Sequence, residues 1–119
     1  TLMLGSYVSA AYETRRDPAA VQFYKALLQW AGVPSPVTVS GASPEVRYLE
    51  SGRDILLFVF NHGGQAIDPS VSLRLPDRSY NAVDLVTRNV IQTATGASGT
   101  TIRERIAPDD VWVVKLSPR

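Results

Sequence analysis

The residues best suited to acid–base chemistry are eleven aspartates and glutamates and a single histidine. Hydrolysis of a glycosidic bond needs two carboxyl groups about 5–10 Å apart, one of which often has a raised pKa. Most acidic residues of this chain lie at helix caps or turns, where a structural role accounts for their presence. Asp17 precedes a proline at a helix start, Asp54 lies in a turn, and Asp109 follows Pro108 in a tight connection. We therefore predict that this chain holds no catalytic residue.

A serine–histidine–aspartate relay would have to use His62, the one histidine of the chain. His62 lies in the segment Asn61-His62-Gly63-Gly64, directly after a run of six apolar residues at 55–60. One interpretation is a strand exit in which the Asn61 side chain ties the following loop, and the other is a proton shuttle. We favour the strand exit, because asparagine and glycine are residues that turns prefer.

Metal and cofactor sites are not predicted either. The chain has no cysteine and one histidine, and its carboxylates lack the spacing of a calcium-binding loop. Gly63-Gly64 and the segment 96–99 lack the pattern of a phosphate-binding loop. The net charge is +1 with scattered basic residues, so nucleic acid is not an expected partner. No apolar run approaches the ~18 residues of a membrane-spanning helix, so we expect no membrane partner.

The chain of 119 residues has the length of one ordinary domain, or of a small domain with a remnant of another. The apolar segment 1–12 predicts a buried strand. Asp17-Pro18 predicts a helix start, and apolar residues at spacings of three and four extend that helix over 18–31. Two close prolines in 33–36 favour an extended linker. We therefore expect a remnant of an α/β domain at 1–33 and a second domain at 37–119.

Residues 37–119 show short apolar strands separated by turn residues about every ten positions, which is typical of a β-sandwich. Segments 45–50 and 55–60 predict a hairpin around 51–54. The second of them is apolar at every position, so we expect both of its faces to be covered. Later segments, such as 111–116, place alternate residues on opposite faces. The predicted fold is mainly β, an antiparallel immunoglobulin-like sandwich preceded by a short strand and one α-helix.

Several segments together resemble the carboxy-terminal region of β-galactosidases of glycoside hydrolase family 42. The segments 4–8 and 11–13 resemble the last strand and loop of that family's trimerisation domain, and 23–33 its final helix. Within the sandwich, the matching segments are 46–52, 56–62, 83–87 and 107–111. The turn 87–89 departs from the family pattern because it lacks glycine, and 94–101 is a longer insert. The family's catalytic glutamates belong to a barrel that this chain lacks, so the resemblance brings no catalytic residue.

The resemblance implies a non-catalytic accessory domain that packs against neighbouring domains or subunits of a glycoside hydrolase. We expect its interface around Leu2, Leu4, Phe23 and Trp30, with self-association of the isolated chain as a consequence. The alternative is a carbohydrate-binding module that presents surface tyrosines to sugars, with Tyr48 and Tyr80 as the contacts. Three further aromatic residues are expected in the core: Phe58, Phe60 and Trp112.

Overall fold

The computed structural model describes residues 17–75, 79–96 and 99–119. The chain divides into two compact units, Thr1–Ser35 and Pro36–Arg119. The strand expected within residues 1–12 and the interface residues Leu2 and Leu4 lie outside the described residues.

Helix α2 of the first unit spans Pro18–Trp30. It begins at Asp17, whose side chain accepts a hydrogen bond of 2.9 Å from the backbone N–H of Ala19. The proline at the first helical position costs no hydrogen bond there. Ala31 caps the carboxyl end and Gly32 follows with a φ of +66°. The helix therefore ends one residue before the expected Ala31, because Ala31 already belongs to the cap.

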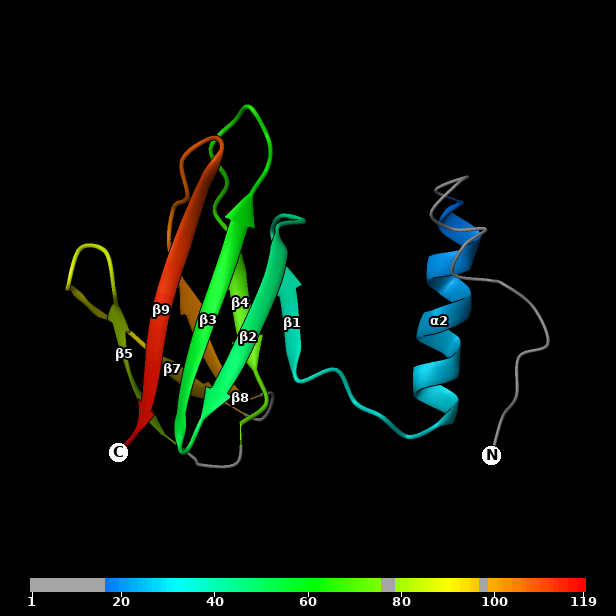
Figure 1. Ribbon diagram of the computed structural model, residues 1–119, viewed down its shortest axis with the longest axis horizontal. Coiled ribbons are helices and arrows are strands. Elements are labelled where there is room, and N and C mark those ends of the chain that lie inside the picture. Colours follow the sequence, from blue (N-terminus) through cyan, green and yellow to red (C-terminus); the bar gives the residue numbers. More distant parts are fainter. Residues whose placement is uncertain (1–16, 76–78, 97–98) are drawn as a thin grey trace. The chain divides into compact units, whose positions relative to one another are not determined.

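The second unit is an antiparallel β-sandwich, as the sequence predicts (Figure 1). One sheet has the strand order β1 (Val37–Ser40), β4 (Ser70–Leu73), β8 (Gly99–Arg103), β7 (Ala94–Gly96). The other has the order β2 (Glu45–Ser51), β3 (Asp54–Asn61), β9 (Asp110–Pro118), β5 (Tyr80–Asp84), β6 (Val90–Ile91). Figure 1 shows β2, β3 and β9 side by side, with the first sheet behind them. The expected hairpin is the pair β2–β3, in which Ser51 lies opposite Asp54.

The segment 90–96 contains two short strands that belong to different sheets. Val90–Ile91 forms β6 in the five-stranded sheet, whereas Ala94–Gly96 forms β7 in the four-stranded sheet. The chain therefore crosses between the sheets at Gln92 and Thr93. Both strands are short, and each is the edge strand of its sheet. The two sheets are therefore only partly covered by strands along this edge of the sandwich.

The core lies between the two sheets and consists of side chains from alternate strand positions. In β3 the side chains of Ile55, Leu57 and Val59 are buried there, while Leu56 and Phe58 on the opposite face are only half-buried. In β9 the buried set is Trp112, Val114 and Leu116. The facing sheet contributes Val71, Leu73 and Ile102. The two-residue rhythm seen in the sequence of β9 thus separates buried from half-buried residues.

The insert at 94–101 forms part of the hairpin β7–β8. Gly99 begins β8 with a φ of +110°, a backbone conformation that other residues adopt only with strain. A Cβ atom at this position would overlap the carbonyl group of Leu73 on the neighbouring strand β4. The glycine therefore permits the close approach of β8 to β4 at this end of the sheet.

Candidate functional site

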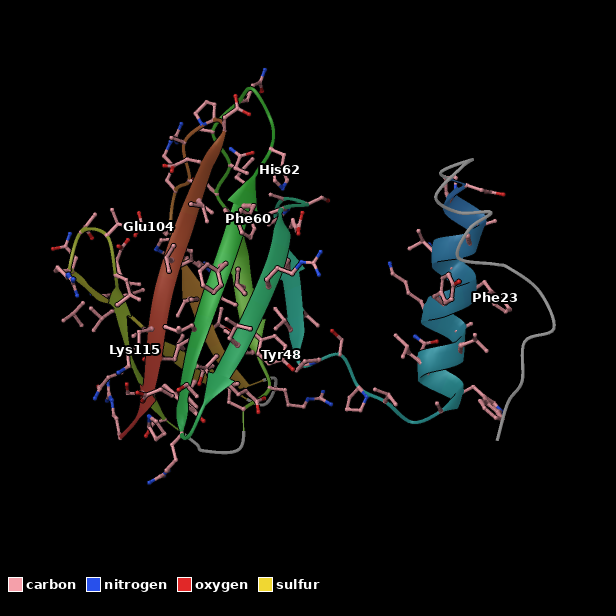
Figure 2. The ribbon with its side chains drawn as sticks, viewed as in Figure 1. Phe23, Tyr48, Phe60, His62, Glu104 and Lys115 are labelled. Atoms are coloured by element: carbon pink, nitrogen blue, oxygen red, sulfur yellow. The ribbon has the colours of Figure 1, made fainter. Side chains whose placement is uncertain are left out.

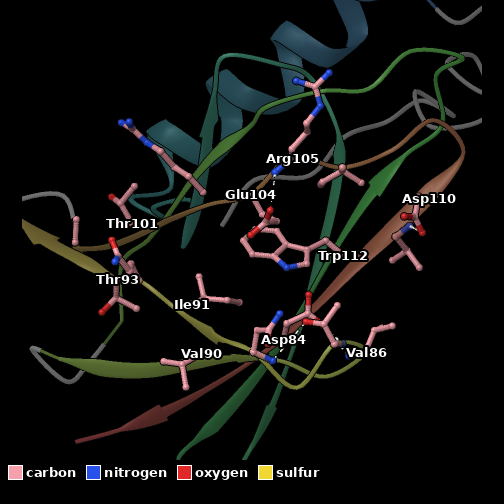
Figure 3. A pocket seen from close by; sticks show the side chains of 17 residues that line it. Asp84, Val86, Val90, Ile91, Thr93, Thr101, Glu104, Arg105, Asp110 and Trp112 are labelled. Carbon is pink, nitrogen blue, oxygen red and sulfur yellow. Dashed lines mark hydrogen bonds between the residues drawn. The ribbon is translucent and has the colours of Figure 1, made fainter.

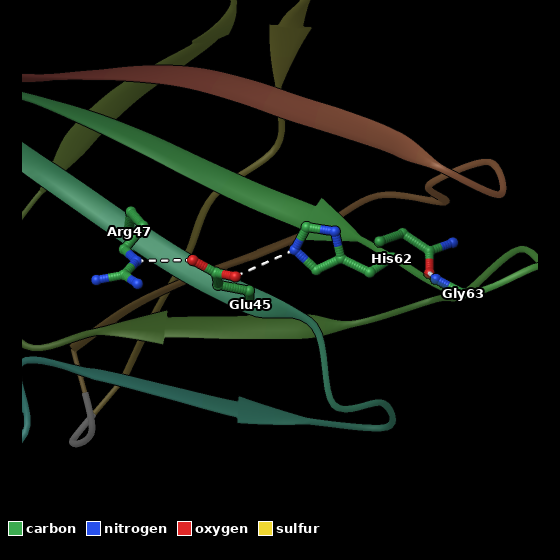
Figure 4. A network of polar contacts seen from close by, with 5 residues as sticks. Glu45, Arg47, His62 and Gly63 are labelled. Atoms are coloured by element: carbon green, nitrogen blue, oxygen red, sulfur yellow. Dashed lines mark hydrogen bonds and ion pairs between the residues drawn. The ribbon is translucent and has the colours of Figure 1, made fainter. Parts of the chain in front are cut away.

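His62 takes part in an ion-pair network on the protein surface (Figure 4). Its Nε2 lies 3.1 Å from Oε2 of Glu45, and Oε1 of Glu45 accepts a 2.8 Å hydrogen bond from Nε of Arg47. The hydrogen bonds from Arg47 and His62 lower the pKa of Glu45 below its ordinary value. A general acid needs the opposite shift. The network therefore stabilises a charged carboxylate at an exposed position and does not form the centre of a proton relay.

The neighbouring Asn61 ties the loop that follows β3. Its side chain is buried, and Nδ2 donates hydrogen bonds of 2.8 Å to the carbonyl oxygens of Gln65 and Ala107. Its Oδ1 accepts a 3.0 Å hydrogen bond from the backbone N–H of Gly63. The strand-exit interpretation of this segment is thereby confirmed, since one amide side chain satisfies groups from two separate loops.

A row of rings lies on the side of β3 that faces away from the core. The ring centroids of Phe58 and Phe60 are 6.4 Å apart with an interplanar angle of 12°. Those of Phe60 and His62 are 5.7 Å apart at 3°. Figure 2 shows Phe60 and His62 near the end of the strand. The expectation that Phe58 and Phe60 are core residues is wrong, because the alternate positions Leu57 and Val59 take the inward face. Trp112 is a core residue, as expected, with 4% exposure.

Further apolar residues surround these phenylalanines on the same side of the five-stranded sheet. Leu49 of β2 lies opposite Leu56 and is 59% exposed, and on β9 Val113 lies opposite Phe58. The outer face, as we use the term, consists of Leu49, Leu56, Phe58, Phe60, Val111 and Val113. Within the sandwich unit, the inward face of β3 is buried and its outer face is half-buried, so a cover for the outer face stays a prediction.

Tyr80 is not a surface residue, and its expected role as an exposed sugar contact is wrong. Its side chain is 1% exposed and belongs to the core, because β5 directs Tyr80, Ala82 and Asp84 between the sheets. Tyr48 is half-buried and packs against the same core from β2. These two tyrosines therefore do not form a flat exposed platform.

Two of the four expected interface residues belong to the described part of helix α2. Phe23 is 39% exposed and Trp30 is 68% exposed, and Phe23 contacts Tyr24 edge to face at 5.8 Å. No residue of this helix is buried. The helix thus carries large apolar side chains in contact with solvent.

A groove of about 940 Å³ opens at the side of the sandwich where β6 and β7 leave the edge short (Figure 3). We call it the edge groove. Asp84, Ile91, Glu104 and Trp112 are among its lining residues. Oδ1 of Asp84 accepts hydrogen bonds from the backbone N–H groups of Val86 and Thr87 at 2.7 and 2.8 Å. The edge groove is not predicted from the sequence, because residues far apart in the chain form it.

The indole N–H of Trp112 has no hydrogen-bond partner although Nε1 is buried. In Figure 3 the indole lies between Glu104 and Asp84. Buried polar groups almost always have a partner, so this donor is an exception that needs an explanation. The sequence alone predicts that the side chain of Trp112 points into the core. It does not predict that the indole N–H lacks a hydrogen-bond acceptor there.

The described residues contain no group of three or more histidine, cysteine, aspartate or glutamate side chains that could hold a metal ion. None of the described helices is both long enough and apolar enough to cross a bilayer. Asp17 caps helix α2, and Asp54 pairs with Lys115 at 2.7 Å, so each of these two carboxylates has a structural partner within its own unit.

Fold, core and surface features together define a small antiparallel β-sandwich linked to a helix. A solved structure of a rhamnosidase from Novosphingobium sp. PP1Y has the same fold over 82% of this chain, with a TM-score of 0.65 and 15% sequence identity. The match covers 10% of that rhamnosidase chain, so the similar region is a small part of a much longer protein. The sequence matches no protein-family model and no curated protein sequence.

Proposed function

We propose that this chain is a non-catalytic accessory domain of a larger glycoside hydrolase and packs against neighbouring domains of that enzyme. The observation that carries this proposal is the likeness to one tenth of a rhamnosidase chain, an enzyme whose name states that it acts on rhamnosides. Nine tenths of that chain lie outside the match. A non-catalytic sandwich domain within a longer enzyme contributes through the surfaces by which it contacts neighbouring domains.

The outer face supports this role. Leu49 is largely exposed and Phe58 and Phe60 are half-buried, so the isolated domain presents an apolar surface to water. Apolar surfaces that extend over several strands usually mark an interaction site. The occupant that we propose is another domain of the same enzyme, because the matched rhamnosidase region is one tenth of a much longer chain. Charged groups lie on the same side of the sheet, since Glu45 and Arg47 of β2 form an ion pair opposite Phe60 and Phe58.

Our proposal for the substrate of the larger enzyme rests on the sequence resemblance and not on the fold. The segments 46–52, 56–62 and 107–111 resemble the end of family 42 β-galactosidases. On that basis we propose a β-galactosidase-like parent, while the structural likeness supports the broader class of glycoside hydrolases. The helix α2, with Phe23 and Trp30 exposed, then belongs to the preceding domain and contacts a neighbouring domain or subunit.

The test uses an antibody raised against this chain to detect and purify the native polypeptide from its source cells. We expect a polypeptide much larger than the 13.0 kDa of this chain, and we expect the purified protein to hydrolyse aryl glycosides. The isolated chain should not hydrolyse them. A native polypeptide of the same size as this chain, or turnover by the isolated chain that a carboxylate substitution abolishes, would contradict the proposal.

A further inference from the structure

We infer that the edge groove is a binding site for a neutral saccharide, with Trp112 and Asp84 as its hydrogen-bonding residues. This inference does not rest on the accessory role, since it concerns a different surface from the outer face. It also differs from a tyrosine platform, because Tyr80 is buried and Tyr48 packs against the core. The residues that carry it lie on β5, β9 and the segment between β8 and β9.

The edge groove has the size of a small-molecule site and a polar group held in place. Its volume of about 940 Å³ is at the upper end of the range of about 300–1,000 Å³ that is usual for small-molecule sites. It lies where the short strands β6 and β7 leave the edge of the sandwich open. Two backbone hydrogen bonds to Oδ1 hold the Asp84 carboxyl group in place. The groove therefore has a polar group whose position is fixed before any ligand arrives.

The buried N–H group of Trp112 has no hydrogen-bond partner. Trp112 is 96% buried, because its exposure is 4%, and it lines the groove. A buried donor without an acceptor is unfavourable, and an oxygen atom of a bound molecule removes that penalty. In Figure 3 the indole lies between Glu104 and Asp84, with its nitrogen on the side of Asp84. Ligand binding thus satisfies a group that the protein alone leaves unsatisfied.

The side chains that line the groove indicate the class of ligand. Both arginines of the lining already have polar partners, since Arg103 donates to Ser70 and Arg105 pairs with Asp68. The buried side chains that line the groove include the carboxyl group of Asp84, which favours a ligand that donates hydrogen bonds over an anion. A hydroxyl group can accept from Trp112 and also donate to Asp84, and a sugar carries several of them in fixed positions. The exposed valines at the rim, Val86 and Val90, fit the C–H face of a sugar ring.

The experiment follows the fluorescence of Trp112 in the full chain. The chain has two tryptophans, so Trp30→Phe leaves Trp112 as the single emitter. The variant is titrated with D-galactose, D-glucose, D-mannose, L-rhamnose and short β-linked oligosaccharides, each up to about 50 mM, which is well above a millimolar dissociation constant. We expect a saturable change in emission with at least one of these sugars, and calorimetry of the unaltered chain should give the same affinity.

The decisive variant is Asp84→Asn, which keeps an oxygen for the two backbone hydrogen bonds but removes the charge. It should weaken binding by about tenfold or more, the loss typical of a hydrogen bond to a charged group. The matched control is Asp54→Asn, a carboxylate outside the groove, and it should bind like the parent chain. Thermal melting followed by circular dichroism shows that both variants are folded.

Two results would overturn the inference. One is the lack of a saturable signal by both fluorescence and calorimetry with every sugar of the set. The other is binding that Asp84→Asn leaves unchanged, since the sugar then occupies a different surface. Neither result affects the accessory role, which the size of the native polypeptide tests separately.

Discussion

The five-stranded sheet has two apolar faces with different surroundings. On β3, Leu57 points into the space between the sheets and has no exposure, whereas the adjacent Leu56 points to the outer face and is half-buried. The inner face is closed by the second sheet, while the outer face of β3 is half-buried. Two leucines with the same side chain thus have different surroundings. Leu57 stabilises the fold, and Leu56 belongs to the outer face, which we propose as a contact surface.

The largest expected effect comes from shortening an inner-face residue. Leu57→Ala should lower the free energy of unfolding by about 2–5 kcal/mol, because it removes buried methyl groups and leaves a cavity. The matched change Leu56→Ala should cost about 1 kcal/mol or less, since its side chain already contacts solvent. Urea denaturation of the two variants measures both values. Equal losses would show that the outer face is part of a closed core, contrary to our account.

The second prediction compares neighbouring polar residues at the end of the same strand. Asn61→Ala should lower the free energy of unfolding by about 1–3 kcal/mol, because buried backbone groups of two loops lose their partner. His62→Ala should change it by less than about 0.5 kcal/mol, since the His62–Glu45 pair is exposed. The same denaturation experiment measures both. A large loss for His62→Ala would mean that the network in Figure 4 has a structural role.

The third prediction concerns the outer face itself. Phe58→Ser should lower the free energy of unfolding by only about 1 kcal/mol. It should reduce self-association of the isolated chain more clearly, because self-association buries exposed apolar surface. Sedimentation velocity at several protein concentrations measures the change. The control is Thr38→Ser, an exposed position on the four-stranded sheet, which should associate like the parent chain. If the Phe58→Ser variant associates as strongly as the parent chain, the outer face is not the surface through which the chains associate.

The smallest effect is expected at the border of the outer face, where Lys115 contacts Asp54 at 2.7 Å. Hydrogen bonds from Lys115 and then from Ser117 lower the pKa of Asp54 in the folded state. The pair therefore contributes to stability above the unfolded pKa of the aspartate, and that contribution is lost as the pH falls through the folded pKa. Lys115→Met should raise the Asp54 pKa towards its ordinary value, as NMR titration of the carboxyl carbon can show. An unchanged pKa would mean that Lys115 is not the cause.

The sequence predicts the architecture well because local rules determine it. The alternation at 111–116 places Trp112, Val114 and Leu116 on the buried face, and Asp17-Pro18 marks the helix start. The purely apolar segment 55–60 gives no such alternation, so Phe58 and Phe60 could not be assigned to a face from the sequence alone. The packing of segments that are distant in the sequence decides which face of β3 is buried. The residues of the strand itself do not reveal it.

The candidate sites were harder to predict for the same reason. Tyr80 is buried because its strand directs it between the sheets, and no neighbouring residue in the sequence reveals that direction. The edge groove combines Asp84 with Glu104 and Trp112, which three different segments supply. The tie made by Asn61 could be predicted, since asparagine followed by glycines after a strand is a known turn signal. Sites formed by local segments were predictable, and those formed by distant ones were not.

The most direct test of the account is hydroxyl-radical footprinting of the outer face in two forms of the protein. Oxidation of Leu49, Phe58 and Phe60 is measured by mass spectrometry in the isolated chain and in the longer native polypeptide. The account predicts that the three side chains are oxidised in the isolated chain and protected in the longer polypeptide, because another domain covers them. Equal oxidation in both forms would contradict the claim that the outer face is the docking surface of an accessory domain.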